Sequence, residues 1–214
     1  MSSQTRPQVM QKTLSKSVRL IPLLAMLVVT LVAIGMQSNL SYASDNSATN
    51  QAITSPKWQE YSQGVATWMW FDVYQATLFV DANSILDSSS GAKLNRLSSQ
   101  QLLSESRSLK LQLCYAREVT PEQFIEGANH VLPVKLKPDI RKQVDALHNA
   151  YQTVEKGDCY SLIYNNQTRI TQLKLNDKLV FSTDLKGFKQ VYFGIWIGDN
   201  PLSSSLKNAL LNAS

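Results

Sequence analysis

Few residues of this chain have the type and spacing that catalysis requires. The chain holds two cysteines, Cys114 and Cys159, and two histidines, His130 and His148. It has no CxxC, HExxH, GxSxG, GxGxxG or phosphate-binding glycine loop, so the usual sequence signals of redox, metal, hydrolytic and nucleotide chemistry are missing. Both histidines lie in predicted helices, away from any second pair of metal ligands. We therefore expect no metal site and no cofactor.

The two cysteines are the clearest chemical pair. An even pair in an oxidising compartment can form a disulfide. Cys114 and Cys159 each lie in a predicted strand, so a bridge would join two strands that are distant in sequence. Closing a loop of about 45 residues can stabilise a fold by ~3–4 kcal/mol. We favour the disulfide, and the alternative is two buried free thiols.

Aromatic and basic residues do not combine into a nucleic-acid site. The tryptophans lack the interleaved Arg/Lys pattern of a base-stacking surface, so we predict that they lie in the core. They are Trp58, Trp68, Trp70 and Trp196. A short basic run is interpreted as an exposed helix-entry face, with an anion site as the alternative. It comprises Lys135, Lys137, Arg141 and Lys142.

The formal charge of +5 comes from 21 basic and 16 acidic residues. Four of the basic residues, and no acidic one, precede residue 44, which leaves a net charge near +1 for the rest of the chain. Bulk electrostatic attraction to nucleic acid is thereby excluded as a functional argument.

The first 43 residues carry a predicted targeting signal. An apolar run from Leu20 to Gly35 follows the four basic residues and precedes the small-residue site Ser41-Tyr42-Ala43. This is the pattern of a secretory signal peptide. We predict a periplasmic or secreted protein cleaved near Ala43, with a polar linker at residues 44–56. The alternative is an uncleaved membrane anchor, and membrane contact is expected only through that run.

Residues 57–214 suffice for one domain with its own core. Strands are predicted at residues 158–164 and in a hairpin of 169–175 and 179–182 across Asn176-Asp177. Residues 64–80 are rich in aromatic and β-branched residues and predict one bent strand, or two with a break near Asp72. Residues 108–117 alternate apolar and polar side chains, which predicts a strand with one face on the core.

Helices are predicted between and after these strands. Thr120 and Pro121 begin one that runs to Val131. The apolar stripe of residues 138–155 predicts another, with Gly157 as its C-terminal cap. Residues 201–211 predict a last helix, with Asn200 as a cap. Residues 94–106 fit a short helix or a loop, and residues 187–196 fit either a helix or a strand. This order predicts an α+β fold with a largely antiparallel sheet.

Four blocks of the sequence resemble chalcone isomerase-like proteins, and in particular exported, bacterial-type members. Residues 71–79 (FDVYQATLF) are similar to the family's VY-x-A-x-LY strand, and residues 113–119 (LCYAREV) to its Y-x-R-D-I strand end. Residues 156–162 (KGDCYSL) resemble its GD-x-Y-x-L element, and residues 188–211 its F…IWLG-x-x-P…LL ending. The resemblance implies an open-faced antiparallel sheet with helices on one side. It also implies that residues 187–196 are helical.

The resemblance does not carry the family's enzymatic activity over to this chain. It implies that the plant enzymes cyclise a chalcone with the help of an Arg on the strand just before the VY block. It also implies that fatty-acid-binding members hold a carboxylate with a buried Arg. The corresponding neighbourhood here, residues 66–70 (ATWMW), contains neither Arg nor Lys.

The resemblance and the aromatic-rich sheet lead to our first hypothesis, an exported, non-catalytic domain. It would bind a small apolar or amphipathic ligand between sheet and helices. Tyr74, Tyr115 and Tyr160 would offer hydroxyls to the ligand, and Arg117 a charge. For each tyrosine the alternative is a core position, and for Arg117 an ion pair with Glu118 or a helix acid.

Two other functions stay open at this point. One is an isomerase or lyase in which Tyr74 or Tyr115 acts as acid/base and Arg117 stabilises an enolate. The other is a structural or interaction role at the cell envelope, which predicts an interior filled by side chains.

Overall fold

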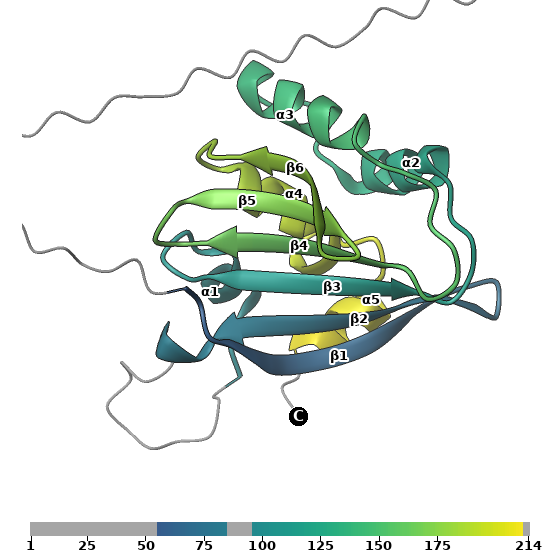
Figure 1. Cartoon of the computed structure of the whole chain (residues 1–214), viewed down its shortest axis with the longest axis horizontal. Helices are drawn as coiled ribbons and strands as arrows, with labels where there is room; N and C mark the ends of the chain where they lie inside the picture. The colour runs from purple at the N-terminus through teal and green to yellow at the C-terminus, as the bar shows by residue number, and fades with distance from the viewer. Residues whose placement is uncertain (1–54, 85–95, 212–214) are drawn as a thin grey trace, which may run out of the picture. The chain divides into compact units, whose positions relative to one another are not determined.

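The computed structural model describes residues 55–84 and 96–211. Six strands form one sheet in chain order, each antiparallel to its neighbours (Figure 1). They are β1 (Trp58–Trp68), β2 (Phe71–Asp81), β3 (Leu109–Tyr115), β4 (Cys159–Asn165), β5 (Ile170–Leu175) and β6 (Lys178–Thr183). The predicted fold class is confirmed. The predicted leader, and the linker apart from its last two residues, lie outside the described residues.

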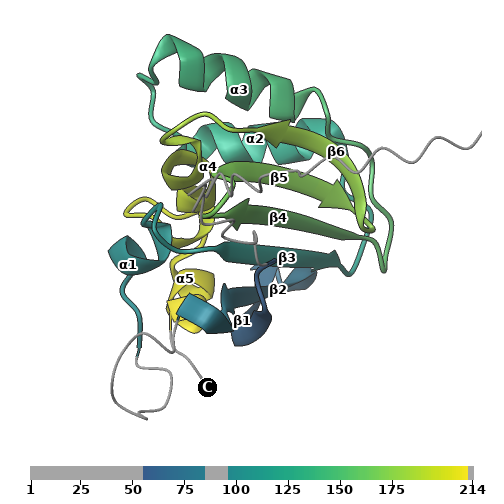
Figure 2. The same cartoon turned by 60° about the vertical axis from the view of Figure 1, so that its left-hand side comes forward.

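Five α-helices and one short 3-10 helix occupy the connections and the C-terminal end. They are η1 (Ala82–Ser84), α1 (Ser99–Leu103), α2 (Pro121–Val131), α3 (Pro138–His148), α4 (Phe188–Ile197) and α5 (Ser204–Leu211). Figure 1 shows α4 and α5 behind the sheet, and in the turned view of Figure 2 both helices stand at its left-hand side. The helix that the resemblance implied for residues 187–196 is present as α4.

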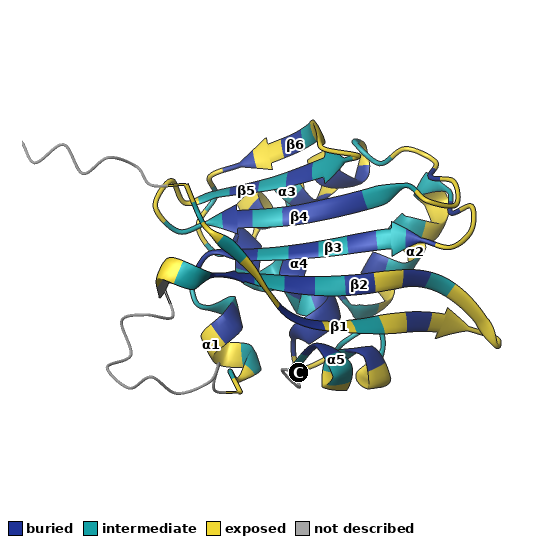
Figure 3. Ribbon diagram, turned by 60° about the horizontal axis from the view of Figure 1, so that its bottom comes forward, coloured by how far each residue is buried: buried dark blue, intermediate teal, exposed yellow. Residues whose placement is uncertain are grey.

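Strand β3 shows how the sheet separates its two faces. Leu109, Leu111, Leu113 and Tyr115 are buried against the helices, while the residues between them are half-buried on the open face. Figure 3 shows a similar alternation along much of β2, whereas β4 has three consecutive buried residues, Tyr160–Leu162. The predicted period-2 pattern of β3 is confirmed.

Helix α3 is shorter than its apolar stripe predicts. It ends at His148 rather than near residue 155. Val154 instead exchanges two backbone hydrogen bonds with Val119, each 3.1 Å long. These bonds form an isolated β-bridge, so the end of the stripe is not helical, and there Val154 is buried and Tyr151 is half-buried. Gly157, predicted as the helix cap, lies with φ 99° in the turn before β4.

The first hairpin departs from prediction at its tip. The chain reverses at Met69 and Trp70, not near Asp72. Pairing of β2 with β3 begins only at Tyr74, so the end of the β1–β2 hairpin extends beyond the rest of the sheet. Trp68 and Trp70 are therefore 69% and 100% exposed, and the prediction that they belong to the core is wrong.

The remaining tryptophans and the last helix complete the comparison with prediction. Trp196 is buried as expected, and Trp58 is half-buried. Asn200 does not cap α5, because its side chain donates to the carbonyl of Val131. The amide of Leu206 donates instead to Ser203 Oγ, which caps the helix.

Candidate functional site

Three of the predicted ligand-binding residues lie side by side on the helix-facing side of the sheet. Tyr74 of β2 is directly opposite Tyr115 of β3, and their ring centroids are 5.6 Å apart. Tyr160 of β4 is 6.2 Å from Tyr115. All three side chains are buried. The sheet register thus brings together residues that are up to 86 positions apart in the sequence.

Rings from the helical side fill the space above these tyrosines. Phe124 of α2 lies 5.4 Å from Tyr115 and 5.6 Å from Tyr160. Tyr151, just after α3, stacks on Phe124 at 4.8 Å and lies 5.5 Å from Tyr160. Edge and stacked contacts at these distances are favourable aromatic packing. In this structure the tyrosine cluster is packed with protein side chains.

Protein groups also engage several of the hydroxyls in this cluster. Trp196 Nε1 donates to the Tyr74 hydroxyl at 3.0 Å. The Tyr160 hydroxyl accepts from the Gln152 amide at 2.8 Å, and the Tyr151 and Tyr192 hydroxyls lie 2.7 Å apart.

Burial shifts the ionisation of these tyrosines away from neutral pH. It raises the pKa of Tyr74 to about 12, against a smaller lowering by the Trp196 hydrogen bond. Burial also raises the pKa of Tyr115 well above its usual value, and it raises the pKa of Tyr160. The three phenols therefore stay protonated at neutral pH and are poor general bases there.

Arg117 is not part of this cluster. It is exposed in the segment that follows β3, next to the exposed Glu118. The structure therefore brings together three of the four predicted ligand-binding residues. Their role in binding a ligand stays a prediction.

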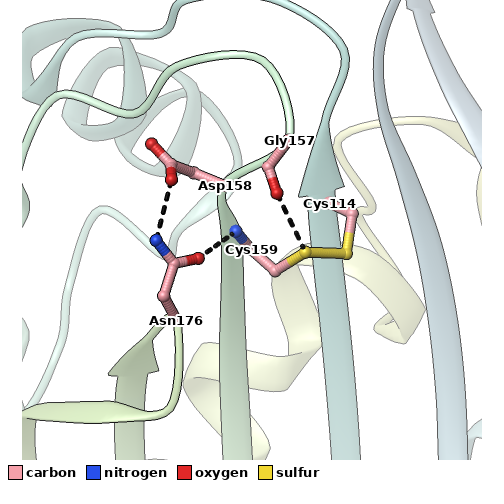
Figure 4. Close-up of a disulfide and its surroundings, with 5 residues drawn as sticks. All are labelled: Cys114, Gly157, Asp158, Cys159 and Asn176. Carbon is pink, nitrogen blue, oxygen red and sulfur yellow. Dashed lines mark hydrogen bonds between the residues drawn. A yellow bond between two sulfur atoms is a disulfide. The ribbon is translucent and has the colours of Figure 1, made fainter.

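The predicted disulfide between Cys114 and Cys159 is present. The two residues are directly opposite each other in β3 and β4, with their Cα atoms 4.1 Å apart. The Asn176 side chain accepts from the Cys159 amide and donates to Asp158, which fixes the start of β4 against the β5–β6 turn (Figure 4). The bridge lies at the end of β3 beside Tyr115, and it has a structural role there.

A separate feature of the structure is an open groove of about 1400 Å³ along α4. Its floor is the half-buried side of α4, which carries Gln190, Val191 and Gly194, and it continues to the cap residues Gly187 and Gly198, of which Gly198 is buried. One wall comes from α1 and the residues after it. The other comes from the segment between α2 and α3. Apolar wall and floor residues include Leu103, Val131, Leu132, Leu185 and Ile195.

The glycine at the centre of the floor has no packing explanation among the described residues. Gly198 cannot be larger, because a Cβ there would lie 2.5 Å from the Gly194 carbonyl oxygen, and Gly187 has φ 87°. Gly194 is helical, and no described atom beyond its chain neighbours and its own stretch of helix backbone lies within 4 Å of a Cβ built on it. A glycine inside a helix costs about 1 kcal/mol relative to alanine. Gly194 thus leaves open space on the groove floor at a cost to helix stability.

Buried polar contacts fix the α1 wall to α4. Lys189 is 1% exposed, and its Nζ donates to the carbonyl oxygens of Ser104 and Arg107. Glu105 accepts from the Gly187 amide at 2.7 Å. At the other end of α4, Ser99 Oγ donates to the Ile197 carbonyl.

Two contacts of Lys189 with its surroundings affect its charge. The Lys189 ammonium lies 4.7 Å from the centre of the Tyr164 ring. Burial lowers the pKa of Lys189 to about 7, with the nearby Arg107 lowering it further and Glu105 raising it. Lys189 therefore titrates near neutral pH while holding the wall in place.

The described part of the chain has neither a metal-binding cluster nor a membrane-spanning helix. Residues 55–84 and 96–211 contain no group of three His, Cys, Asp or Glu side chains that could hold a metal ion. Within the same residues, no helix has both the length and the hydropathy needed to cross a bilayer.

The architecture and the sequence agree on a family. A family model described as chalcone isomerase-like matches residues 48–212, which include every strand and helix above. The chain belongs to the chalcone isomerase-like family. The resemblance of the four sequence blocks is thereby confirmed at the level of the family.

Comparison with solved structures agrees with the fold. The chain is similar to a fatty-acid binding protein of Arabidopsis thaliana, with a TM-score of 0.53 and 11% sequence identity. The match covers 72% of this chain and 86% of that one. At this identity the likeness shows a shared fold. No curated protein sequence matches the chain.

Sequence reasoning missed the groove along α4 and the buried Lys189. A signal for the groove does exist in the sequence. Gly187, Gly194 and Gly198 are spaced by seven and four residues, which places them on one face if the segment is helical. Lys189 has no such signal, because its partners are backbone carbonyls more than 80 positions away.

Proposed function

We propose that this chalcone isomerase-like domain is a non-catalytic binding protein for a small apolar or amphipathic molecule, which it holds in the groove along α4. The observation that carries the proposal is Gly194, a helix-interior glycine with open space above it at the centre of the groove floor. Membership of the family and the shared fold with a fatty-acid binding protein support a binding role in general.

The lining of the groove fits a molecule with an apolar body and an acidic head. Leucine, valine and isoleucine side chains line the walls and floor. Lys137 is the N-cap residue of α3, and Lys186 precedes Gly187, which lies against Ile140 of the same helix. The two lysines thus flank one end of the groove, where their ammonium groups would bind a carboxylate beside the acidic side chains of Asp139 and Glu105.

The proposal includes export. It rests on the apolar run from Leu20 to Gly35 and the small-residue site at Ala43, which are typical of a cleaved leader. The mass of the chain recovered from the cell envelope tests this part. A mature chain that begins at Ser44 is expected, and an intact N-terminus would contradict it.

Filling the groove from its floor tests the binding proposal. Gly194→Leu places a side chain in the open space, so the affinity for a fluorescent fatty-acid analogue, 11-(dansylamino)undecanoic acid, should fall roughly tenfold or more. The variant should keep its fold, because leucine is favoured over glycine in a helix by about 0.8 kcal/mol. Probe fluorescence measures the affinity, and thermal melting checks the fold.

Ala146→Leu on the exposed side of α3 is the matched control, since it places the same side chain on a helix position outside the groove. Its probe affinity should equal that of the wild type. An unchanged affinity in a folded Gly194→Leu variant would remove the groove from the proposed function.

A further inference from the structure

The tip of the β1–β2 hairpin exposes four large apolar side chains in a row. Trp68, Met69, Trp70 and Phe71 are 69%, 71%, 100% and 66% exposed. Figure 3 shows the exposed end of this hairpin extending past the other strands. Contiguous exposed apolar residues on a soluble domain mark an interaction site. This tip is separate from the groove, and the inference below goes beyond the proposed function.

The turn at the tip is built from residues that folding does not favour. Met69 and Trp70 have φ values of 46° and 76°, the left-handed region that two-residue hairpin turns usually fill with Asn, Asp or Gly. The same chain uses the usual residues in its β5–β6 turn, where Asn176 and Asp177 have φ values of 46° and 65°. Met and Trp at the first turn cost backbone strain and gain no burial in return, which points to a role outside the fold.

We propose that the Trp68–Phe71 tip inserts into the interface of a lipid bilayer. Tryptophan is enriched at membrane interfaces, because its ring is apolar and its indole N–H can stay hydrogen-bonded to the polar layer. Residues 64–71 contain no charged side chain. Four side chains on a projecting turn fit a fluid interface, whereas a protein interface of standard size uses about 20–30 residues on each side.

The charges at the base of the hairpin indicate whether the tip would prefer neutral or anionic lipids. Asp72 directly follows the tip, and Arg117 and Glu118 lie at the same end of the sheet, where the Ala116 amide bonds to the Val73 carbonyl. These charges are of mixed sign, so they do not form the basic collar that selects anionic lipids. Insertion is therefore expected into neutral phosphatidylcholine bilayers, with little dependence on salt.

Tryptophan emission tests the insertion directly on the full chain. All four tryptophans follow residue 57, so their emission does not report on the predicted leader. Vesicles of phosphatidylcholine with brominated acyl chains should quench roughly half of the emission, because two of the four tryptophans enter the interface. Vesicles without bromine should leave the emission bright and shifted to the blue.

A turn variant separates insertion from folding. Met69→Asn with Trp70→Gly installs the favoured turn residues and keeps Trp68 as a reporter, so it should raise the melting temperature and abolish quenching. Trp70→Ser alone should reduce quenching without the change of turn type. Leu179→Ser, at an exposed apolar position of the β5–β6 hairpin, should behave as the wild type. Unquenched wild-type emission, or equal quenching in the turn variant, would overturn the proposal.

Discussion

Lys189 is a charged residue buried in the first turn of α4, at the α1 wall of the groove. A lysine in an apolar helix is normally expected to face solvent, since its charge is costly to bury. Here, in the first turn of α4, its ammonium donates to the carbonyls of Ser104 and Arg107 and lies beside the Tyr164 ring. We conclude that Lys189 positions the wall of the groove.

Replacing this lysine should weaken the fold by an amount that depends on pH. Lys189→Met takes away the ammonium hydrogen bonds to the carbonyls of Ser104 and Arg107, although the Ser104 carbonyl keeps its bond from the Arg107 amide, so we expect a loss of about 1–3 kcal/mol. Between pH 7 and about 10.5 the unfolded wild type binds a proton at this lysine that the folded protein does not. The free energy of unfolding of the wild type, relative to the variant, should therefore rise with pH across this window.

Urea unfolding at several pH values between 7 and 9.5 measures this difference. Taking the difference between the two proteins isolates the contribution of Lys189, because the charged neighbours Glu105 and Arg107 are present in both. Wild-type and variant stabilities that run parallel over this range would contradict the lowered pKa of Lys189.

At the scale of single residues, the sequence predicted the tyrosine cluster better than its surroundings. The alternation along β3 indicates that Tyr115 faces the core, and the structure adds Tyr74 and Tyr160 beside it. Tryptophans 68 and 70 were misjudged, because an aromatic residue in a strand pattern is normally buried. Their exposure depends on how far the hairpin extends past β3, which the composition of residues 64–80 does not encode.

At the scale of elements, the disulfide fastens two neighbouring strands at the end that carries the tyrosine cluster. It closes a loop of 45 residues that includes α2 and α3. Cys114→Ser with Cys159→Ser should lower the free energy of unfolding by about 3–4 kcal/mol, because the unfolded chain regains the entropy of that loop.

Chemical denaturation with and without reductant measures the contribution of the bridge. Reductant should lower the stability of the wild type to that of the double serine variant and leave the variant unchanged. Equal stabilities of the oxidised wild type and the variant would show that the strand pairing alone holds this end of the sheet.

Helix boundaries show where pattern and structure part at this scale. The stripe of residues 138–155 has helical spacing, yet the helix stops at His148. A long-range backbone pairing of Val119 with Val154 forms in place of the last turn of the predicted helix. Such pairing is invisible to a local pattern. The hairpin across Asn176-Asp177 was predicted correctly because its turn residues specify it locally.

At the scale of the whole molecule, family membership and the order of elements were accessible from the sequence, and the groove was not. The groove needs α1, α4 and the segment between α2 and α3 to meet, and these are brought together only by the tertiary fold. The sequence instead predicted a ligand site in the interior between the sheet and the helices. In this structure that interior is packed with Tyr115, Phe124 and Tyr151.

The proposed tip insertion changes the expected relation of the molecule to membranes. From the sequence, we expect membrane contact only through the apolar run from Leu20 to Gly35. The exposed Trp68–Phe71 tip would give the folded domain a membrane contact of its own. A ligand-binding groove on a domain that rests on a bilayer would be suited to a molecule that partitions into lipid.

Binding in the groove can be tested by a titration of the ¹⁵N-labelled protein with dodecanoate, followed by amide chemical shifts. We expect saturable shifts at Gly187, Gly194 and Gly198, which line the floor of the groove, and none at these positions in the Gly194→Leu variant. Shifts confined to Tyr74, Tyr115 and Tyr160 would place the ligand in the aromatic interior instead. That result, or no saturable shift at all, would contradict the proposal that the groove along α4 is the binding site.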